Sequence, residues 1–542
     1  MSTNATTSAS GTTNNRLLCA NCNANLMLDS AMTSADWVSF RSRIDLLLKS
    51  NDNPAPRELQ SMQVCLASAE SKVQNIEQQI FLLQQQREML EKEKRELRRY
   101  IIDQRAVLNP IRRVPIEILT KIFTICVDSA IHSGWDNPLS TKTIRWAIGY
   151  TCRSWRAVSL NAPSLWSNIQ VILDEHRAAF SSQARLLGLH VQRSKFLPLT
   201  IGLFSASYTA NITPNHSFLA VLTPSVDRWQ HLHLAMNPVH MQQCLSHIAP
   251  FFSSLESLTT SFTHDWDPSD NTTCDVFQDA GMLHEATLRY NVILMKLRWG
   301  NIRSLTLLFD SSPLRDILST LRQMSKLETL QILYDSSSAP RANDPGTGYL
   351  PVRLSSLRTL RLTRLNPDNN EVNVRHLLSA LVLPQLETFI DPELSVDIGV
   401  ILSLLQWSKC TTLSHFETSA AISEDKILYI LQNYPQIKIL ELCGVTSLTN
   451  TIINKLIYSS SSSCLLPLLE DLVLKGQMSF DAEPFVCMLE SRFLAFSSGE
   501  NISCMKKVSL QWLGDSLPMD IAAFERFEQP LFKGFDFDIS CN

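Results

Sequence analysis

The sequence lacks a strong excess of charge of either sign. Its 542 residues include 48 Lys and Arg against 52 Asp and Glu, which gives a formal net charge of −4. Binding to nucleic acid or to an anionic membrane surface usually requires a large basic excess. We therefore predict no nucleic-acid partner and no membrane partner, and we expect the partners to be proteins.

Long hydrophobic runs and a secretion signal are also missing. The first thirty residues carry no apolar stretch behind a basic start, and no later run reaches the roughly eighteen apolar residues of a membrane span. The 13 cysteines are scattered, and Cys126, Cys410 and Cys487 each lie singly in an apolar stretch, as reduced core thiols do. These features predict a cytoplasmic or nuclear location, or both.

No complete catalytic fingerprint is present. The chain has no Gly-rich phosphate loop, no Gly-x-Ser-x-Gly elbow and no His-Glu-x-x-His helix. Cys19 and Cys22 form a Cys-x-x-Cys pair, but a zinc site needs two further ligands and none lies nearby. We therefore predict no enzyme activity, no metal site and no cofactor. An enzyme whose Ser, His and Asp residues meet only in the folded chain is the alternative.

The N-terminal region divides into a polar leader and a helical segment. Residues 1–34 are rich in Ser, Thr and Asn, which predicts a disordered leader. Residues 36–106 are predicted to be a helical coiled-coil segment, because apolar residues recur in steps of three and four. The first core position holds Leu59, Leu66, Val73, Ile80 and Ile101, and the second holds Met62, Ala69, Ile76, Leu83, Leu90 and Leu97.

Two charged residues, Arg87 and Lys94, interrupt the first core position. Charges there weaken a homodimer core but restrict its register. The pattern favours a coiled coil with a second copy of the chain. The alternatives are a long helix whose apolar stripe packs on the rest of the chain, or a helical spacer without a partner.

A new unit is predicted to follow Asn109-Pro110, because proline lacks a backbone donor and clashes with the preceding turn. A helix start is expected at Val114-Pro115, with proline in the first turn. Apolar residues then recur at helical spacing: Ile118, Leu119, Ile122, Phe123 and Cys126. A loop from Asp128 to Thr143 leads to a second helical pattern, which carries Trp146, Cys152, Trp155 and Val158.

Three motifs in this unit stand in a fixed order. Pro-x-Glu-Ile-Leu-x-x-Ile-Phe begins at Pro115, Cys-Arg-x-Trp-Arg-x-Val begins at Cys152, and Pro-x-Leu-Trp begins at Pro163. Together, over residues 108–168, they resemble the F-box motif, especially the F-box-like form abundant in mushroom-forming fungi. The resemblance implies a small all-α domain that docks on a Skp-type adaptor, which joins it to a cullin scaffold and a RING subunit.

By this resemblance, six residues would contribute to adaptor docking: Val114, Pro115, Ile118, Leu119, Ile122 and Phe123. A sixty-residue helical unit cannot bury all its large apolar groups internally, which agrees with a docking role. Two alternatives remain. Many of these apolar residues can instead form the core of the motif itself, and the whole segment can serve as a cap on the repeats that follow.

Beyond about residue 190 an apolar triplet at i, i+3 and i+5 returns at uneven intervals. Clear copies are Ile302-Leu305-Leu307, Leu327-Leu330-Ile332, Leu357-Leu360-Leu362, Ile437-Leu440-Leu442 and Leu469-Leu472-Leu474. The middle residues Leu305, Leu330 and Leu360 are 25 and 30 residues apart, near the period of leucine-rich repeats. The triplets resemble leucine-rich-repeat units without a regular asparagine ladder. In this reading, four outward strand positions line a concave face: Thr306, Gln331, Arg361 and Glu441.

The sequence as a whole predicts an α/β protein with four segments: a leader (1–34), a helical coiled coil (36–106), an F-box-like all-α domain (108–168) and an irregular leucine-rich-repeat solenoid (190–542). We expect the substrate-recognition subunit of a Skp-cullin-F-box ubiquitin ligase, whose solenoid binds an unknown protein substrate. The alternative is a non-catalytic scaffold that acts independently of any ligase.

Overall fold

The computed structural model describes most of the chain. The described residues are 34–132, 140–173, 180–204, 216–261, 273–289, 295–308, 313–334, 349–364, 372–393, 396–459, 465–512 and 535–541. The predicted leader up to residue 33, with its Cys-x-x-Cys pair, lies outside them. The chain divides into two compact units, Met1–Val114 and Pro115–Asn542, which we describe separately.

The described part of the first unit is helical and contains one very long helix. Its elements are α1 (Ser34–Ser50), α2 (Pro56–Leu108) and the 3₁₀ turn η1 (Pro110–Arg113). The single segment predicted over 36–106 is therefore two helices. Asn51 has a positive φ of 56°, and Pro56 occupies the first turn of α2, a position suited to a helix start. The long helix ends at Leu108, directly before Asn109-Pro110.

The second unit begins with a group of short helices. These are α3 (Ile116–His132), α4 (Ile144–Thr151), α5 (Arg153–Asn161) and the 3₁₀ turn η2 (Pro163–Trp166). The second helical pattern in the sequence thus forms two helices, because Cys152 between them has extended backbone angles. The Cys152 thiol accepts a hydrogen bond from the Trp155 N–H at 3.4 Å and so caps the start of α5.

The rest of the second unit is built on a parallel sheet of fourteen strands. In spatial order they are β1 (Asn168–Ile172), β2 (Leu199–Phe204), β3 (Trp229–Ala235), β4 (Ser257–Ser261), β5 (Glu285–Leu288), β6 (Ser304–Leu308), β7 (Thr329–Tyr334), β9 (Thr359–Arg364), β11 (Thr388–Asp391), β12 (His415–Thr418), β13 (Ile439–Val445), β14 (Asp471–Gly476), β15 (Lys507–Trp512) and β16 (Asp536–Cys541). A separate pair joins β8 (Val352–Arg353) and β10 (Leu381–Val382).

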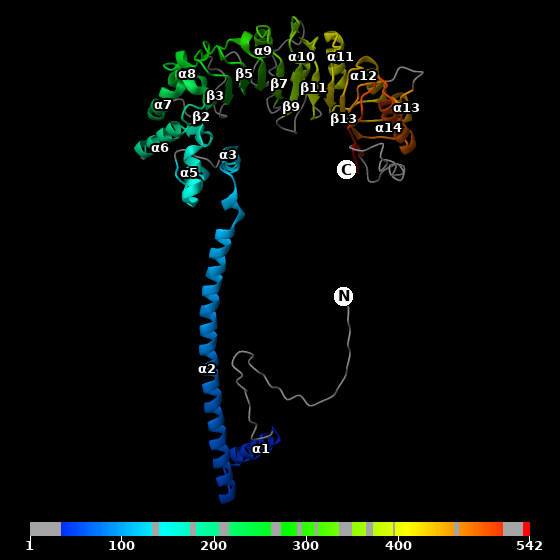
Figure 1. The fold of residues 1–542 in the computed structure, drawn as a ribbon. Coiled ribbons are helices and arrows are strands. Elements are labelled where there is room, and N and C mark those ends of the chain that lie inside the picture. Colours follow the sequence, from blue (N-terminus) through cyan, green and yellow to red (C-terminus); the bar gives the residue numbers. More distant parts are fainter. Residues whose placement is uncertain are drawn as a thin grey trace. The chain divides into compact units, whose positions relative to one another are not determined.

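Helices connect many of these strands and lie along the outer side of the curved sheet, while the strands lie along its inner side (Figure 1). The α-helices are α6 (Phe180–Arg193), α7 (His216–Leu222), α8 (Pro238–Leu245), α9 (Leu314–Leu321), α10 (Val372–Ser379), α11 (Ile398–Ser408), α12 (Glu424–Asn433), α13 (Asn450–Leu456) and α14 (Ala482–Ser497). Short 3₁₀ turns are η3 (Thr223–Arg228), η4 (Ala249–Phe251) and η6 (Trp299–Asn301).

The core of the sheet is organised in rows that cross all its strands. One row consists of register-matched residues: Ile169, Ile201, Leu232, Leu258, Ala286, Leu305, Leu330, Leu360, Phe389, Phe416, Leu440, Leu472, Val508 and Phe537. All but Phe537 are at most 2% exposed. Stacking of neighbouring units buries the apolar face that no single strand and helix can bury alone.

The structure confirms a mixed α/β protein in which a long helix near the N-terminus precedes parallel strands. The clear apolar triplets each place their last two residues on a strand and are buried at all three positions. The sheet begins earlier than the predicted boundary near residue 190, because Asn168–Ile172 already forms β1.

Candidate functional site

Helix α3 carries four of the six residues predicted to bind an adaptor, and it divides them between two sides. Leu119 and Phe123 are 4% and 2% exposed, and they share their side of the helix with buried Val127 and Ile131. The Phe123 ring packs on Trp155 of α5, with the ring centroids 4.9 Å apart. These two residues therefore hold α3 against its own unit.

The other side of α3 is apolar and open to solvent. Ile118, Ile122 and Ile125, at spacing i, i+4 and i+7, are 49%, 40% and 57% exposed. Pro115 and Cys126 lie on the same side and are also exposed. We call these five residues the α3 patch. A set of large aliphatic side chains left in water on one helix face is a feature of interaction surfaces.

The remaining predicted docking residue, Val114, ends the first unit. It is half-buried, and its N–H donates a hydrogen bond to the Ile111 carbonyl oxygen at 3.4 Å, which closes η1. Ile125 was not among the predicted residues. Its spacing from Ile118 and Ile122 was the signal in the sequence that places it on their side of the helix.

Aromatic packing attaches the helical group to the sheet. Trp166 of η2 is 1% exposed, and its Nε1–H donates to the Ser159 carbonyl oxygen at 2.9 Å. Trp146 of α4 meets Trp166 edge to face, with the centroids 5.6 Å apart. The Arg193 guanidinium of α6 lies over both rings, 4.6 Å from Trp146 and 4.4 Å from Trp166. These contacts join α4 and η2 to the first helix that follows β1.

A buried cation lies beside this aromatic cluster. Arg145 is 1% exposed; its Nη2 donates to the Asn168 carbonyl oxygen of β1 at 2.7 Å, and its Nη1 lies 3.0 Å from Nδ1 of His190 on α6. A guanidinium can only donate, so Nδ1 of His190 accepts and the ring proton is on Nε2. The arrangement favours the neutral imidazole. Burial, with the charges of Arg145 and Arg193, lowers the pKa of His190 to about 3.

Acidification is expected to destabilise the second unit through His190. Because its pKa is lowered to about 3 from the ordinary 6.5, the unfolded chain takes up a proton between these values that the folded chain excludes. The contribution of the neutral ring is complete above pH 6.5 and decreases by up to about 1.4 kcal/mol per pH unit below it. Urea unfolding at pH 7, 6 and 5 should show a shallower pH dependence for His190→Gln. Parallel curves for the two proteins would contradict this assignment.

The inner side of the sheet carries the predicted outward strand positions. Thr306, Gln331 and Arg361 are register neighbours on β6, β7 and β9, and Glu441 continues the same row on β13. Arg361 is exposed and the other three are half-buried. The row lies between buried rows and is mixed in character, because β11 contributes Ile390 between Arg361 and Glu417, and β14 contributes Val473 next to Glu441.

Two titratable residues that were not predicted, Glu417 and His415, lie on the same surface. Glu417 of β12 is the register neighbour of Glu441. Burial and the adjacent Glu441 carboxylate raise the pKa of Glu417, while Arg361 opposes that shift. The ring of His415 lies 4.0 Å from the Glu417 carboxylate, and burial lowers the pKa of His415. The surface is therefore polar and partly desolvated on these strands.

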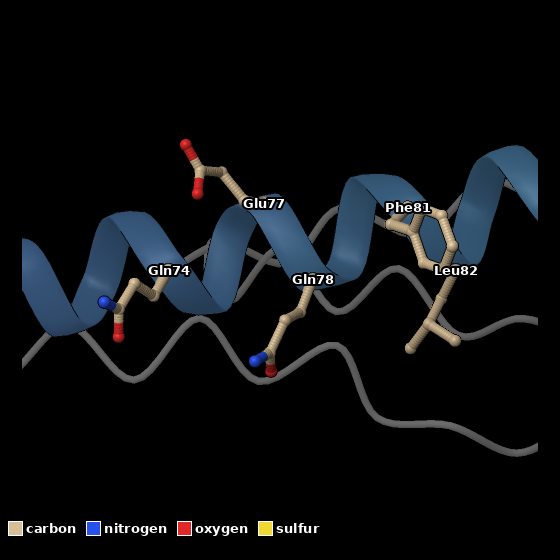
Figure 2. A pocket seen from close by; sticks show the side chains of 5 residues that line it. All are labelled: Gln74, Glu77, Gln78, Phe81 and Leu82. Atoms are coloured by element: carbon tan, nitrogen blue, oxygen red, sulfur yellow. The ribbon is translucent and has the colours of Figure 1, made fainter.

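A shallow hollow lies on α2, and its walls include Gln74, Glu77, Gln78, Phe81 and Leu82 (Figure 2). The five side chains come from three successive turns of one helix and include a single titratable group. The described residues contain no group of three or more His, Cys, Asp or Glu side chains arranged to hold a metal ion.

The cysteines divide differently from the prediction. Of those expected in the core, Cys410 is buried, Cys487 is half-buried and Cys126 is exposed on the α3 patch.

None of the described helices is long and apolar enough to cross a membrane. Comparison with known proteins finds no family model that matches the chain and no curated protein that matches its sequence.

Proposed function

We propose that the chain is the substrate-recognition subunit of a Skp-cullin-F-box ubiquitin ligase. In this proposal, α3 to η2 form the F-box that docks on a Skp-type adaptor, and the parallel sheet with its outer helices is a leucine-rich-repeat solenoid that binds a target protein. The observation that carries the proposal is the α3 patch. Ile118, Ile122 and Ile125 are exposed, whereas the same helix buries four other large apolar side chains, those of Leu119, Phe123, Val127 and Ile131.

The α3 patch suits a docking role for energetic reasons. Covering an exposed isoleucine side chain with a partner surface removes apolar area from water, which favours association. The backbone and the buried side of α3 are already ordered by Leu119 and Phe123, so binding need not also order this helix. In the proposal, Pro115, Ile118, Ile122 and Ile125 contact the adaptor, and Leu119 and Phe123 hold the helix in place.

The inner face of the solenoid suits a target-binding role. Each strand adds alternate side chains to one extended surface, and neighbouring strands supply different chemistry, from Gln331 and Arg361 to Glu417 and Glu441. Such a surface can contact a large protein over several repeats. This subunit would act by proximity. A target held near a conjugating enzyme that carries ubiquitin has a high effective concentration at that enzyme.

A non-catalytic scaffold that acts independently of a ligase is the second candidate. One observation favours it: η2 packs on both β1 and α6, so the helical group also covers the first strand of the sheet. In this reading the group is a structural cap. The α3 patch then has no adaptor to bind, and the two candidates differ in that one respect.

The deciding experiment is co-purification of the full chain with a Skp-type adaptor. The double variant Ile118→Asp/Ile122→Asp should weaken binding by at least about thirtyfold, because a central apolar anchor contributes about 2 kcal/mol or more. Both residues are exposed, so the variant should fold. Trp407→Asp, which changes an exposed side chain of α11 (79% exposed), is the matched control and should bind normally.

Failure of the unaltered chain to bind the adaptor would overturn the ligase proposal and leave the scaffold as the better account. Binding that survives the double variant would also overturn it as stated, because the α3 patch would then not be the docking surface.

A further inference from the structure

The long helix α2 exposes an apolar seam along its whole length. No residue of its 53 is buried. The nine seam residues with large apolar side chains and high exposure are 47–62% exposed: Leu59, Leu66, Val73, Ile76, Ile80, Leu83, Leu90, Leu97 and Ile101. An isolated helix gains little from such residues, whereas a second helix that interlocks with the seam buries them in successive layers.

We propose that this seam binds the same seam of a second copy of the chain, with the two helices parallel and in register. The charges beside the seam favour this occupant and this orientation. In a parallel pair, the residue before each first core position faces the residue five positions later in the other helix. Lys72 then meets Glu77 of the second copy, and Glu93 meets Arg98 of the second copy.

By symmetry each of these pairs forms twice, and the other positions of this type bring no like charges together. They pair Glu58 with Gln63, Cys65 with Glu70, Gln79 with Gln84, Gln86 with Glu91, and Tyr100 with Arg105. An antiparallel pair with full overlap gains Lys72 opposite Glu93, but it also places Glu70 opposite Glu91, which is repulsive. The charges therefore favour the parallel arrangement.

The two charged seam residues occupy fewer layers in the parallel pair than in the antiparallel one. In the parallel pair, Arg87 and Lys94 each face the same residue of the second copy, in two first-position layers that the Leu90 layer separates, and Lys94 lies beside Glu93 of the second copy. Arg87 keeps an ion pair with Glu91 of its own helix at 3.4 Å. The fully overlapped antiparallel pair instead sets Arg87 against Ile76 and Lys94 against Ala69, so each cation would face an apolar residue.

Register is restricted by the same residues. A parallel pair shifted by one heptad would set Arg87 against Ile80, Lys94 against Arg87, and Ile101 against Lys94, so charge would spread over three layers in place of two. In the unshifted pair, both copies continue into residues 115–542 from the same end of the coiled coil. The assembly then joins two copies of the sheet, and two copies raise avidity for a target with two binding sites.

This inference does not depend on adaptor binding and is tested by the mass of the full chain in solution. Light scattering during size-exclusion chromatography should give twice the chain mass of 61.2 kDa. Leu83→Asp, in the middle of the seam, should give the mass of one chain. Phe81→Asp is the matched control, because Phe81 is exposed on the same turn of α2 but lies outside the seam.

Orientation is tested by charge exchange, which leaves the apolar seam intact. Lys72→Glu should raise the dissociation constant of the dimer about tenfold, because two attractive pairs become repulsive. Adding Glu77→Lys should restore the dimer if the helices are parallel. Adding Glu93→Lys should restore it if they are antiparallel, and that result would overturn the proposed arrangement. A single-chain mass for the unaltered protein at micromolar concentration would overturn the dimer itself.

Discussion

Replacing Trp166 with alanine is expected to lower the free energy of unfolding of the second unit by about 3–5 kcal/mol. The indole is almost fully buried and donates a hydrogen bond to the Ser159 carbonyl oxygen. It also contacts the Trp146 ring, the His190 ring at 5.0 Å and the Arg193 guanidinium. Its removal would leave a cavity at the point where the helical group meets the sheet, with one carbonyl oxygen unsatisfied.

The measurement is denaturant unfolding followed by intrinsic fluorescence and circular dichroism. Trp407→Ala is the control, because this tryptophan is 79% exposed and its loss should change stability by less than about 0.5 kcal/mol. Limited proteolysis should also cleave α3 to α5 sooner in the Trp166→Ala protein. Equal stability of the two variants would show that Trp166 does not anchor these helices.

Replacing Arg492 with leucine is expected to have a comparable effect at the other end of the sheet. Arg492 of α14 is 0% exposed, and its guanidinium donates to three backbone carbonyl oxygens, those of Leu456 at 3.0 Å, Leu466 at 3.0 Å and Leu465 at 2.5 Å. Leucine cannot donate, so these buried acceptors would lose their partner. Each unsatisfied group costs about 1–3 kcal/mol, so a loss of about 3 kcal/mol or more is expected.

Thermal unfolding of Arg492→Leu, compared with Arg298→Leu, tests this expectation. Arg298 also donates to a carbonyl oxygen, that of Gln278 at 3.0 Å, but its side chain is 53% exposed and water can replace it. The control should therefore lose less than about 1 kcal/mol. A similar loss of stability in both variants would contradict the expectation that burial makes the Arg492 hydrogen bonds more stabilising than those of the exposed Arg298.

Regular local patterns made much of the sheet predictable. The triplet around Leu305 and its successors combine a period of 25 to 30 residues with alternation over the last two positions, and both properties depend only on neighbours in the chain. Strands such as β5 and β16 were not predicted from the sequence, because they do not carry the full triplet of large apolar residues. Ala286 occupies the row that larger apolar residues fill on the other strands. The break at Cys152 was not predicted, because a single residue with extended backbone angles hardly disturbs the helical spacing of the apolar residues around it.

The candidate site was predictable only in part. The spacing of Ile118 and Leu119 places them on different sides of α3, but it does not say which side meets the rest of the unit. That choice depends on Trp155, which comes from the next helical segment. The contact of Arg145 with His190 joins residues 45 positions apart, and no local pattern links them. Long-range packing decides such features, and a single sequence does not display it.

The order of strands in the sheet has a consequence for synthesis. In the fourteen-stranded sheet, every strand after β1 pairs with one that comes earlier in the chain, and β9 pairs with β7 because β8 is not part of this sheet. The chain segment between two paired strands is short, as between Leu305 and Leu330. The entropy cost of bringing the two ends of such a segment together grows only slowly with its length. When a strand leaves the ribosome, the strand with which it pairs has therefore already been synthesised. The sheet can lengthen one strand at a time during translation, with β1, held by the helical group, as the template.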